Sequence, residues 1–201
     1  MEIVEIVARM TRRSELPMRL RGLLLSPRRE WSLIAAETPD PLALYGRVVL
    51  PLAAIPPVAK LVAWSLLFGF LSLGTAIIAA LVVYLSTLAG VFVLALIAAR
   101  LAPYFDGEAQ LGQALKLVAY AATASWLGGA FRLAPAIGVL SVLATLYGLF
   151  LLASGAPALL AVPAERVLGF TVVLGFAALC LFLLVAGAVA ALFGMGALGM
   201  A

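Results

Sequence analysis

Residues 61–99 read LVAWSLLFGFLSLGTAIIAALVVYLSTLAGVFVLALIAA and contain no charged side chain. Residues 133–164 and 167–201 are also free of charge. Each of these three stretches exceeds the roughly 20 residues that an α-helix needs to cross a bilayer. The whole chain of 201 residues is 66% apolar and only 11% charged. Because soluble domains carry about 25% charged residues, the chain is predicted to be an integral membrane protein.

Polar and glycine- or proline-rich breaks divide the apolar part of the chain into five predicted spans. They are expected at residues 48–68, 75–98, 114–131, 136–153 and 167–193. Residues 154–166 are apolar enough to form a partly buried re-entrant connection instead of a loop. The predicted fold is an all-α polytopic integral membrane protein, with five transmembrane helices in residues 46–201 preceded by cytoplasmic amphipathic helices in residues 1–45.

The charge-rich residues 1–45 are predicted to contain two amphipathic helices. The first is expected around residues 1–10, where charged and apolar positions alternate with helical spacing. The second is expected to begin at Pro27, with Ser26 as a hydroxyl N-cap. Its Trp31 face suits either the lipid headgroup region or packing on the cytoplasmic ends of the spans. The candidate lipid-surface contacts are Arg12, Arg13, Arg28, Arg29 and Trp31.

The basic residues are unevenly distributed around the predicted spans. Eleven of the 13 flank one side: Arg9, Arg12, Arg13, Arg19, Arg21, Arg28, Arg29, Arg47, Arg100, Lys116 and Arg166. The positive-inside rule places this side, with the N-terminus, in the cytoplasm and the C-terminus outside. The excess of arginine over lysine, eleven to two, is typical of a GC-rich bacterial genome, so the bacterial inner membrane is the expected location.

The composition excludes much familiar chemistry. The chain has no histidine and no asparagine, and Cys180 is its one cysteine. This excludes a Ser-His-Asp triad, histidine or multi-cysteine metal sites and intrachain disulfides. None of the nine acidic residues falls within a predicted span, which disfavours ion-coupled transporters and proton pumps. We expect no enzyme activity, no cofactor and no nucleic-acid binding, and we relate the net charge of +4 to topology and anionic lipid.

A small set of polar and special residues remains as candidates for function. Lys60 is expected slightly beyond the middle of the first span, facing the bundle interior or a wet cleft, or near a surface if that span is shifted. Asp106 and Glu108 lie around a glycine in a predicted cytoplasmic loop, where they could bind a metal or a basic partner, although such a pair is more often a solvated turn. The full set of candidates is Lys60, Asp106, Glu108, Tyr45, Gly46 and Tyr147.

Short motifs also follow one another in a recognisable order. They are Leu23-Leu-Leu-Ser-Pro27 with Trp31 and Ile34, Leu44-Tyr-Gly46 with Pro51, Gly112-Gln-Ala-Leu-Lys116 with Ala119-Tyr120, and Leu146-Tyr-Gly-Leu-Phe-Leu-Leu152 with Gly155, Pro157 and Pro163. From about Arg21 to Phe193 the chain resembles the Yip family, the Ypt/Rab-interacting membrane proteins, in its bacterial form. The resemblance implies five spans, a cytoplasmic N-terminus and an outward C-terminus.

The eukaryotic members of the family act in vesicle traffic and bind prenylated small GTPases. The resemblance does not extend to this binding. Their signature near the first span resembles Asp-Leu-Tyr-Gly-Pro. Here Asp40 stands four residues before Leu44, and Arg47 takes the place of the proline. Binding of small GTPases is therefore not carried over.

The sequence favours a non-enzymatic scaffold or adaptor that organises the membrane or partner proteins. Its expected partners are membrane lipids, other membrane proteins or further copies of itself. The alternative is a small carrier, channel or lipid-scrambling protein with a polar cavity around Lys60. A third possibility, an enzyme acting on lipids, has little support beyond Asp106 and Glu108.

Overall fold

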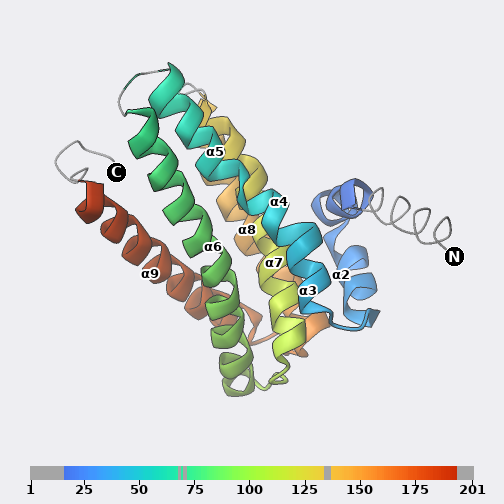
Figure 1. Ribbon diagram of the computed structural model, residues 1–201. Helices are drawn as coiled ribbons and strands as arrows, with labels where there is room; N and C mark the ends of the chain where they lie inside the picture. The colour runs from blue at the N-terminus through green and yellow to red at the C-terminus, as the bar shows by residue number, and fades with distance from the viewer. Residues whose placement is uncertain (1–15, 68, 70–71, 134–136, 194–201) are drawn as a thin grey trace, which may run out of the picture.

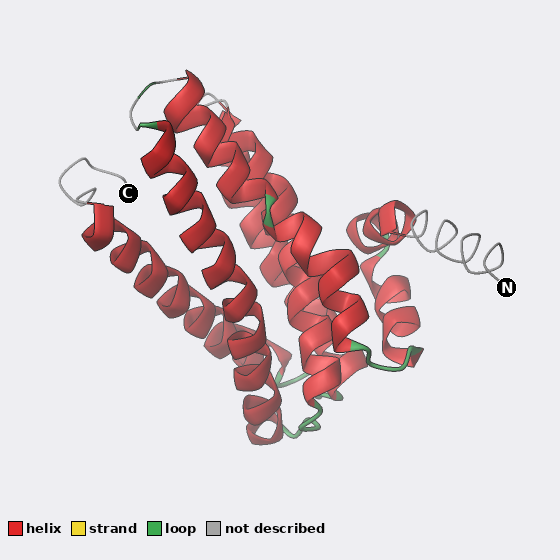
Figure 2. Ribbon diagram, in the orientation of Figure 1, coloured by secondary structure: helices red, strands yellow, loops and turns green. Residues whose placement is uncertain are grey.

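The computed structural model describes residues 16–67, 69, 72–133 and 137–193. Throughout these ranges the chain forms helices joined by short connections, and they contain no strand (Figure 2). The predicted all-α fold is confirmed. The amphipathic helix predicted around residues 1–10, together with Arg12 and Arg13, lies outside the described residues.

Two short helices precede the bundle. Residues 16–25 form the first, and α2 (Pro27–Ala36) follows after Ser26. The start of α2 agrees with the prediction, because a proline in the first turn loses no hydrogen bond. Ser26 occupies the predicted N-cap position, but its side chain makes no capping hydrogen bond. In Figure 1, α2 lies on the opposite side of the bundle from α9 (Val167–Phe193).

The first long helix runs from Pro41 to Leu67 and is irregular. Its segments are α3 (Pro41–Leu44), the π-helical η1 (Tyr45–Val49), α4 (Leu50–Ala53), α5 (Ile55–Leu61) and the π-helical η2 (Val62–Leu67). Three prolines remove backbone donors from the middle of this helix, and the two π-helical turns flank them.

This helix begins earlier than the predicted residue 48. Asp40 caps it, because its Oδ1 accepts a hydrogen bond from the Ala43 backbone N–H at 3.0 Å, and Pro41 occupies the first position. Asp40 is polar and Pro41 is usually a helix breaker, so hydropathy alone predicts that both lie outside the span. In the structure they are its start.

The remaining helices form an antiparallel bundle. They are α6 (Leu73–Leu101), the 3-10 helix η3 (Ala102–Phe105), α7 (Leu111–Gly128), the 3-10 helix η4 (Gly129–Leu133), α8 (Val139–Leu160) and α9. The central helix is α7, which packs against α6, α8 and the first long helix (Figure 1). Twelve of its 18 residues are buried, so the core of the bundle surrounds it.

Four described helices are long and apolar enough to cross a membrane: Pro41–Leu67, Leu73–Phe105, Val139–Leu160 and Val167–Ala191. They overlap four of the five predicted spans. The fifth predicted span, 114–131, overlaps α7, which is shorter and carries Gln113 and Lys116. Because neighbouring helices cover α7, it needs less apolar surface than a helix that faces lipid.

The predicted end of the fourth span at residue 153 is too early. Helix α8 continues to Leu160, and Ala161 then ends it in the left-handed conformation at φ 52°. The stretch from residue 154 to 160 is therefore helical, and the connection to α9 is reduced to residues 161–166. In this stretch Trp31 of α2 packs on Gly155. The helix also continues through Pro157, although a proline in a sequence usually indicates a break.

The two ends of the bundle differ in composition, and we name each after one residue. The Asp106 end holds the connections before α7 and after α8, where the Glu108 N–H donates to the Leu160 carbonyl at 2.7 Å. The Arg132 end holds η4 and the start of α8. Helices α6 and α8 thus both finish at the Asp106 end and run parallel, with α7 antiparallel to both.

Candidate functional site

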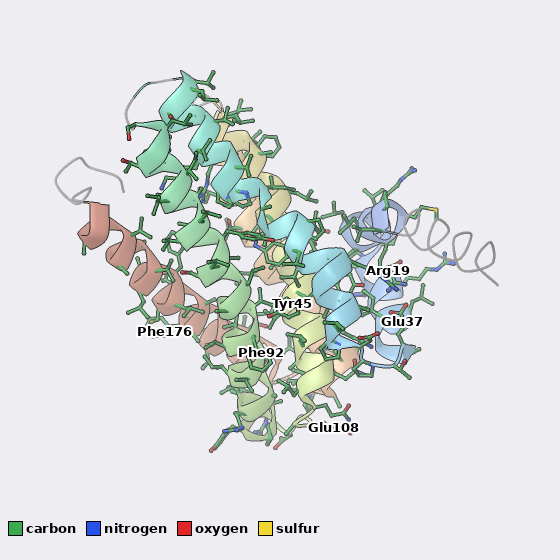
Figure 3. The ribbon with its side chains drawn as sticks, in the orientation of Figure 1. Arg19, Glu37, Tyr45, Phe92, Glu108 and Phe176 are labelled. Carbon is green, nitrogen blue, oxygen red and sulfur yellow. The ribbon has the colours of Figure 1, made fainter. Side chains whose placement is uncertain are left out.

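The most extensive polar contacts in the described part of the chain join the two N-terminal helices to the bundle. Arg19 makes a two-pronged contact with Glu37: its Nη1 donates to Oε2 at 2.8 Å and its Nη2 to Oε1 at 2.5 Å. Nη1 also donates to the Tyr120 hydroxyl of α7 at 3.4 Å. Figure 3 shows Arg19 and Glu37 on the same side of the bundle.

These contacts keep Arg19 and Glu37 charged. The hydrogen bonds with Glu37 raise the pKa of Arg19 against the opposing effect of burial. The same hydrogen bonds hold the pKa of Glu37 below its ordinary value of 4.5, again against burial. The two residues therefore form an ion pair at neutral pH. This pair joins the helix of residues 16–25 to the C-terminal end of α2.

Lys116 of α7 holds the end of α2. Its side chain is buried, and Nζ donates to the backbone carbonyls of Ile34 at 2.8 Å and Glu37 at 2.5 Å. The last carbonyls of a helix have no partner within the helix, and a cation there also suits the helix dipole. Next to it, Gln113 Nε2 donates to the Ala35 carbonyl at 3.2 Å. Two side chains of α7 thus satisfy the C-terminal end of α2.

Trp31 fills the space between α2 and the bundle. It is fully buried, its Nε1 donates to Ser154 Oγ of α8 at 3.0 Å, and its ring meets that of Tyr120 edge to face at 6.4 Å. Gly155 makes room for it, since a Cβ at that position would lie 2.7 Å from the indole ring. The expectation that Trp31 contacts the lipid surface is therefore wrong, and the alternative of a packed helix is the observed one.

The last anchor is Tyr147, whose hydroxyl donates to the Leu24 carbonyl of the first helix at 2.7 Å. We call these residues the docking cluster: Arg19, Trp31, Glu37, Gln113, Lys116, Tyr120, Tyr147 and Ser154. They fix residues 16–37 in one orientation on α7 and α8.

The face of residues 16–37 that points away from the bundle is amphipathic. Three large apolar side chains are exposed on it: Met18, Leu25 and Leu33. Three arginines are exposed beside them: Arg21, Arg28 and Arg29. An exposed face with this mixture of apolar and basic side chains is typical of helices that lie at a membrane interface.

Tyr45 has a structural partner, and Gly46 has none. The Tyr45 hydroxyl donates to the Leu88 carbonyl of α6 at 2.9 Å. In the opposite direction, the Tyr84 hydroxyl of α6 donates to the Leu50 carbonyl at 3.0 Å. The two tyrosines join the first long helix to α6. A Cβ on Gly46 would meet nothing within 4 Å, so this glycine does not serve a close helix approach.

The acidic pair at the Asp106 end forms a turn. Asp106 Oδ2 lies 3.0 Å from Arg166 Nε, and both side chains are more than half exposed. Glu108 Oε2 accepts a hydrogen bond from Gln110 Nε2 at 2.5 Å. Gly107 sits against α8, where a Cβ would lie 2.7 Å from the Leu160 carbonyl oxygen. Among the described residues, no three His, Cys, Asp or Glu side chains are grouped to hold a metal ion.

Lys60 lies near the Arg132 end rather than near the middle of its span. The helix begins at Pro41, 19 residues earlier, which corresponds to about 29 Å at 1.5 Å per residue. The hydrocarbon core is about 30 Å thick. Nζ of Lys60 lies over the Trp64 ring, 4.5 Å from its centroid. The depth of Lys60 in a membrane stays a prediction.

Most of the docking cluster is absent from the candidates drawn from the sequence. Arg19 and Glu37 are 18 residues apart, and Trp31 and Ser154 are 123 residues apart, so spacing carries no signal for either contact. One residue of the cluster could have been found from the sequence. Lys116 lies within the first turns of an apolar helix, and a lysine there requires polar partners.

Comparison with known proteins adds the family. A family model described as the Yip1 domain matches residues 21–197. Searches of curated proteins and of solved structures gave no match. The matched range contains α2, the whole described bundle and the docking cluster apart from Arg19.

Proposed function

This chain belongs to the Yip1 family, and we propose on that premise that it is a non-enzymatic scaffold or adaptor that organises lipids and partner proteins at the membrane. Family membership and the apolar helices support its place in a membrane. The observation that carries the finer proposal is the docked amphipathic pair of helices. A scaffold requires a surface of fixed orientation, and the docking cluster supplies one.

We propose further that the bundle crosses the membrane five times. Helices α6 and α8 run parallel, since both finish at the Asp106 end. If both cross the bilayer, the chain has to return across it between them. Helix α7 is the segment that makes this return, and with 18 residues it extends about 27 Å, close to the thickness of the hydrocarbon core.

In this arrangement the Asp106 end faces the cytoplasm of a bacterial cell. Arg47, Arg100, Lys116 and Arg166 belong to this end or to the turns next to it, whereas the other end carries Arg132 and the nearby Lys60. The positive-inside rule supports that orientation. The exposed face of residues 16–37 then lies on the cytoplasmic side, where Arg21, Arg28 and Arg29 meet anionic lipid headgroups.

The test is photo-crosslinking of the full chain in native membranes. A photoreactive amino acid at Leu33 reports on the exposed face of α2, and the same label at Phe176 reports on the lipid-facing side of α9. We expect defined protein or anionic-lipid adducts at Leu33, reduced by the double substitution Arg28→Gln and Arg29→Gln. Phe176 should give adducts that do not change with this substitution. A Leu33 position that yields adducts identical to those of Phe176 would contradict the scaffold proposal.

A lipid-movement assay distinguishes the scaffold from the alternative function as a carrier, channel or lipid-scrambling protein. The carrier or scrambling protein requires a polar path around Lys60, but the structure gives Lys60 an aromatic partner near one end of the bundle. Vesicles that contain the purified protein should therefore move labelled lipid no faster than protein-free vesicles. Accelerated movement would favour the alternative.

A further inference from the structure

Two basic residues, Lys60 and Arg132, belong to segments that pack against each other at the Arg132 end. Pro56, Lys60 and Trp64 follow at four-residue spacing, which places them on one face of the first long helix. The 3-10 helix η4 packs against this helix, and its Gly129 comes so close that a Cβ would lie 2.7 Å from Pro56 Cγ. Arg132 follows Gly129 by three residues in η4, and Lys60 follows Pro56 by one helical turn, so the two cations belong to segments in direct contact.

Lys60 and Arg132 differ in exposure, and neither has an anionic partner among the described residues. Lys60 is half-buried with its Nζ over the Trp64 ring, and Arg132 is exposed. Stacking on an aromatic ring stabilises a cation but does not neutralise it. Like charges on adjoining segments disfavour each other, and an anion between them would favour both.

The described part of the chain supplies no such anion. Its acidic residues are Glu30, Glu37, Asp40, Asp106, Glu108 and Glu165. The first three belong to α2 and the residues that lead into the first span, and the other three to the connections at the Asp106 end. All six are therefore separated from Lys60 and Arg132 by most of the length of the bundle.

The depth of the pair indicates the chemistry of the missing anion. Arg132 lies in the connection between α7 and α8, outside the long helices, and Lys60 belongs to the helix segment that packs against the start of that connection. This is the level of the lipid phosphates of one leaflet. Tryptophan is enriched at the same level, which suits Trp64.

We propose that Lys60 and Arg132 together bind the phosphate group of an anionic lipid at the Arg132 end of the bundle. The guanidinium of Arg132 offers paired donors to phosphate oxygens, and the Lys60 ammonium offers a point charge from the adjacent helix. The lipid phosphate thereby joins the first span to the α7–α8 connection. This site does not depend on the proposed scaffold role, because it lies at the opposite end of the bundle from the docked helices.

Native mass spectrometry of the full-length protein in detergent tests the proposal. The protein is titrated with phosphatidylglycerol and, in parallel, with phosphatidylcholine. Lys60→Gln and Arg132→Gln should each weaken phosphatidylglycerol binding about fivefold, the effect of one interfacial cation. Phosphatidylcholine binding should weaken less, because its choline balances the charge of the phosphate. Arg100→Gln, which removes an exposed cation from the Asp106 end, is the matched control and should bind like the wild type.

Further arms decide between the remaining explanations. Lys60→Arg keeps the charge and should retain wild-type binding, so a loss in Lys60→Gln cannot be ascribed to damage of the helix. Excess inorganic phosphate should leave lipid binding intact, whereas displacement of the lipid by it would assign the site to a free phosphate anion. Equal phosphatidylglycerol affinity in the wild type, Lys60→Gln and Arg132→Gln would overturn the proposal.

Discussion

The ion pair of Arg19 and Glu37 is a stronger contact than most surface pairs, because both carboxylate oxygens of Glu37 accept hydrogen bonds from Arg19. Its two hydrogen bonds measure 2.8 and 2.5 Å, and Arg19 is mostly shielded from water, with 21% of its side chain exposed. The Glu37 side chain is 44% exposed, so solvent still weakens the pair. We place its contribution at the upper end of the range of about 0.2–1 kcal/mol for exposed pairs.

This pair predicts a pH dependence with a definite sign. The pKa of Glu37 is lowered in the folded protein, so the stabilisation is complete above the ordinary value of 4.5 and is lost as the pH falls through the folded pKa. Glu37→Gln should lower the midpoint of thermal unfolding in detergent at neutral pH and have much less effect well below pH 4.5. A difference that grows on acidification would contradict the assignment.

A second prediction at this scale compares two glycines. Gly155→Ala places a methyl group 2.7 Å from the Trp31 ring, which cannot bend aside, and we expect a loss of about 1–3 kcal/mol. This exceeds the gain of up to about 1 kcal/mol that alanine brings to a helix. Gly46→Ala meets no atom within 4 Å, so the gain should prevail there. Thermal unfolding should therefore shift downward for Gly155→Ala and not for Gly46→Ala.

At the scale of elements, α2 is held mainly by its C-terminal end. Lys116→Met keeps the length of the side chain but removes both hydrogen bonds to the α2 carbonyls. Hydrogen bonds from a charged donor contribute about 1.5–3 kcal/mol each, so loss of both should raise the population of the open state of α2 on the order of a hundredfold or more.

Limited trypsin digestion measures this opening, because Arg28 and Arg29 lie in α2. Cleavage after these residues should accelerate in Lys116→Met in proportion to the open population. Arg100→Met, an exposed position in α6, is the control and should be cleaved after Arg28 and Arg29 at the wild-type rate. Equal rates in Lys116→Met and the wild type would show that α2 does not depend on Lys116.

The elements differ in how far the sequence predicts them. Helix α9 agrees with the predicted range of 167–193, because no charged residue, proline or other strong break lies between its ends. The first long helix and α8 are both longer than predicted, since Asp40-Pro41 and Ser154 to Pro157 resemble loop signals. In each case a contact overrides the local signal, the Asp40 cap in one and the packing of Trp31 on Gly155 in the other.

The docking cluster could not be predicted for a different reason. Hydropathy and helical spacing describe one helix at a time, and they correctly give α2 an apolar face. They do not say whether that face meets lipid or protein. The answer depends on contacts such as Trp31 with Ser154, which form only once α7 and α8 are assembled.

At the scale of the whole molecule, the number of crossings decides where the two ends of the chain lie. Four helices qualify as spans by length and composition alone, and an even number would return the C-terminus to the side of the N-terminus. If α6 and α8 both cross the bilayer, their parallel course places a fifth crossing between them, and we propose that buried α7 makes it. Helix α7 is less hydrophobic than α6, α8 and α9, which suits a helix covered by its neighbours.

The chain is therefore expected to have its termini on opposite sides of the membrane, with residue 1 inside and residue 201 outside. Eleven of the 13 basic residues lie on the inner side in this arrangement. Alkaline phosphatase, which is active only outside, and a fluorescent protein that matures only inside can each be fused to both ends. The phosphatase should be active at residue 201 alone and the fluorescent protein bright at residue 1 alone. Fluorescence at both ends would mean that α7 does not cross, and α6 and α8 could then not both span the bilayer in the parallel arrangement that Glu108 and Leu160 define.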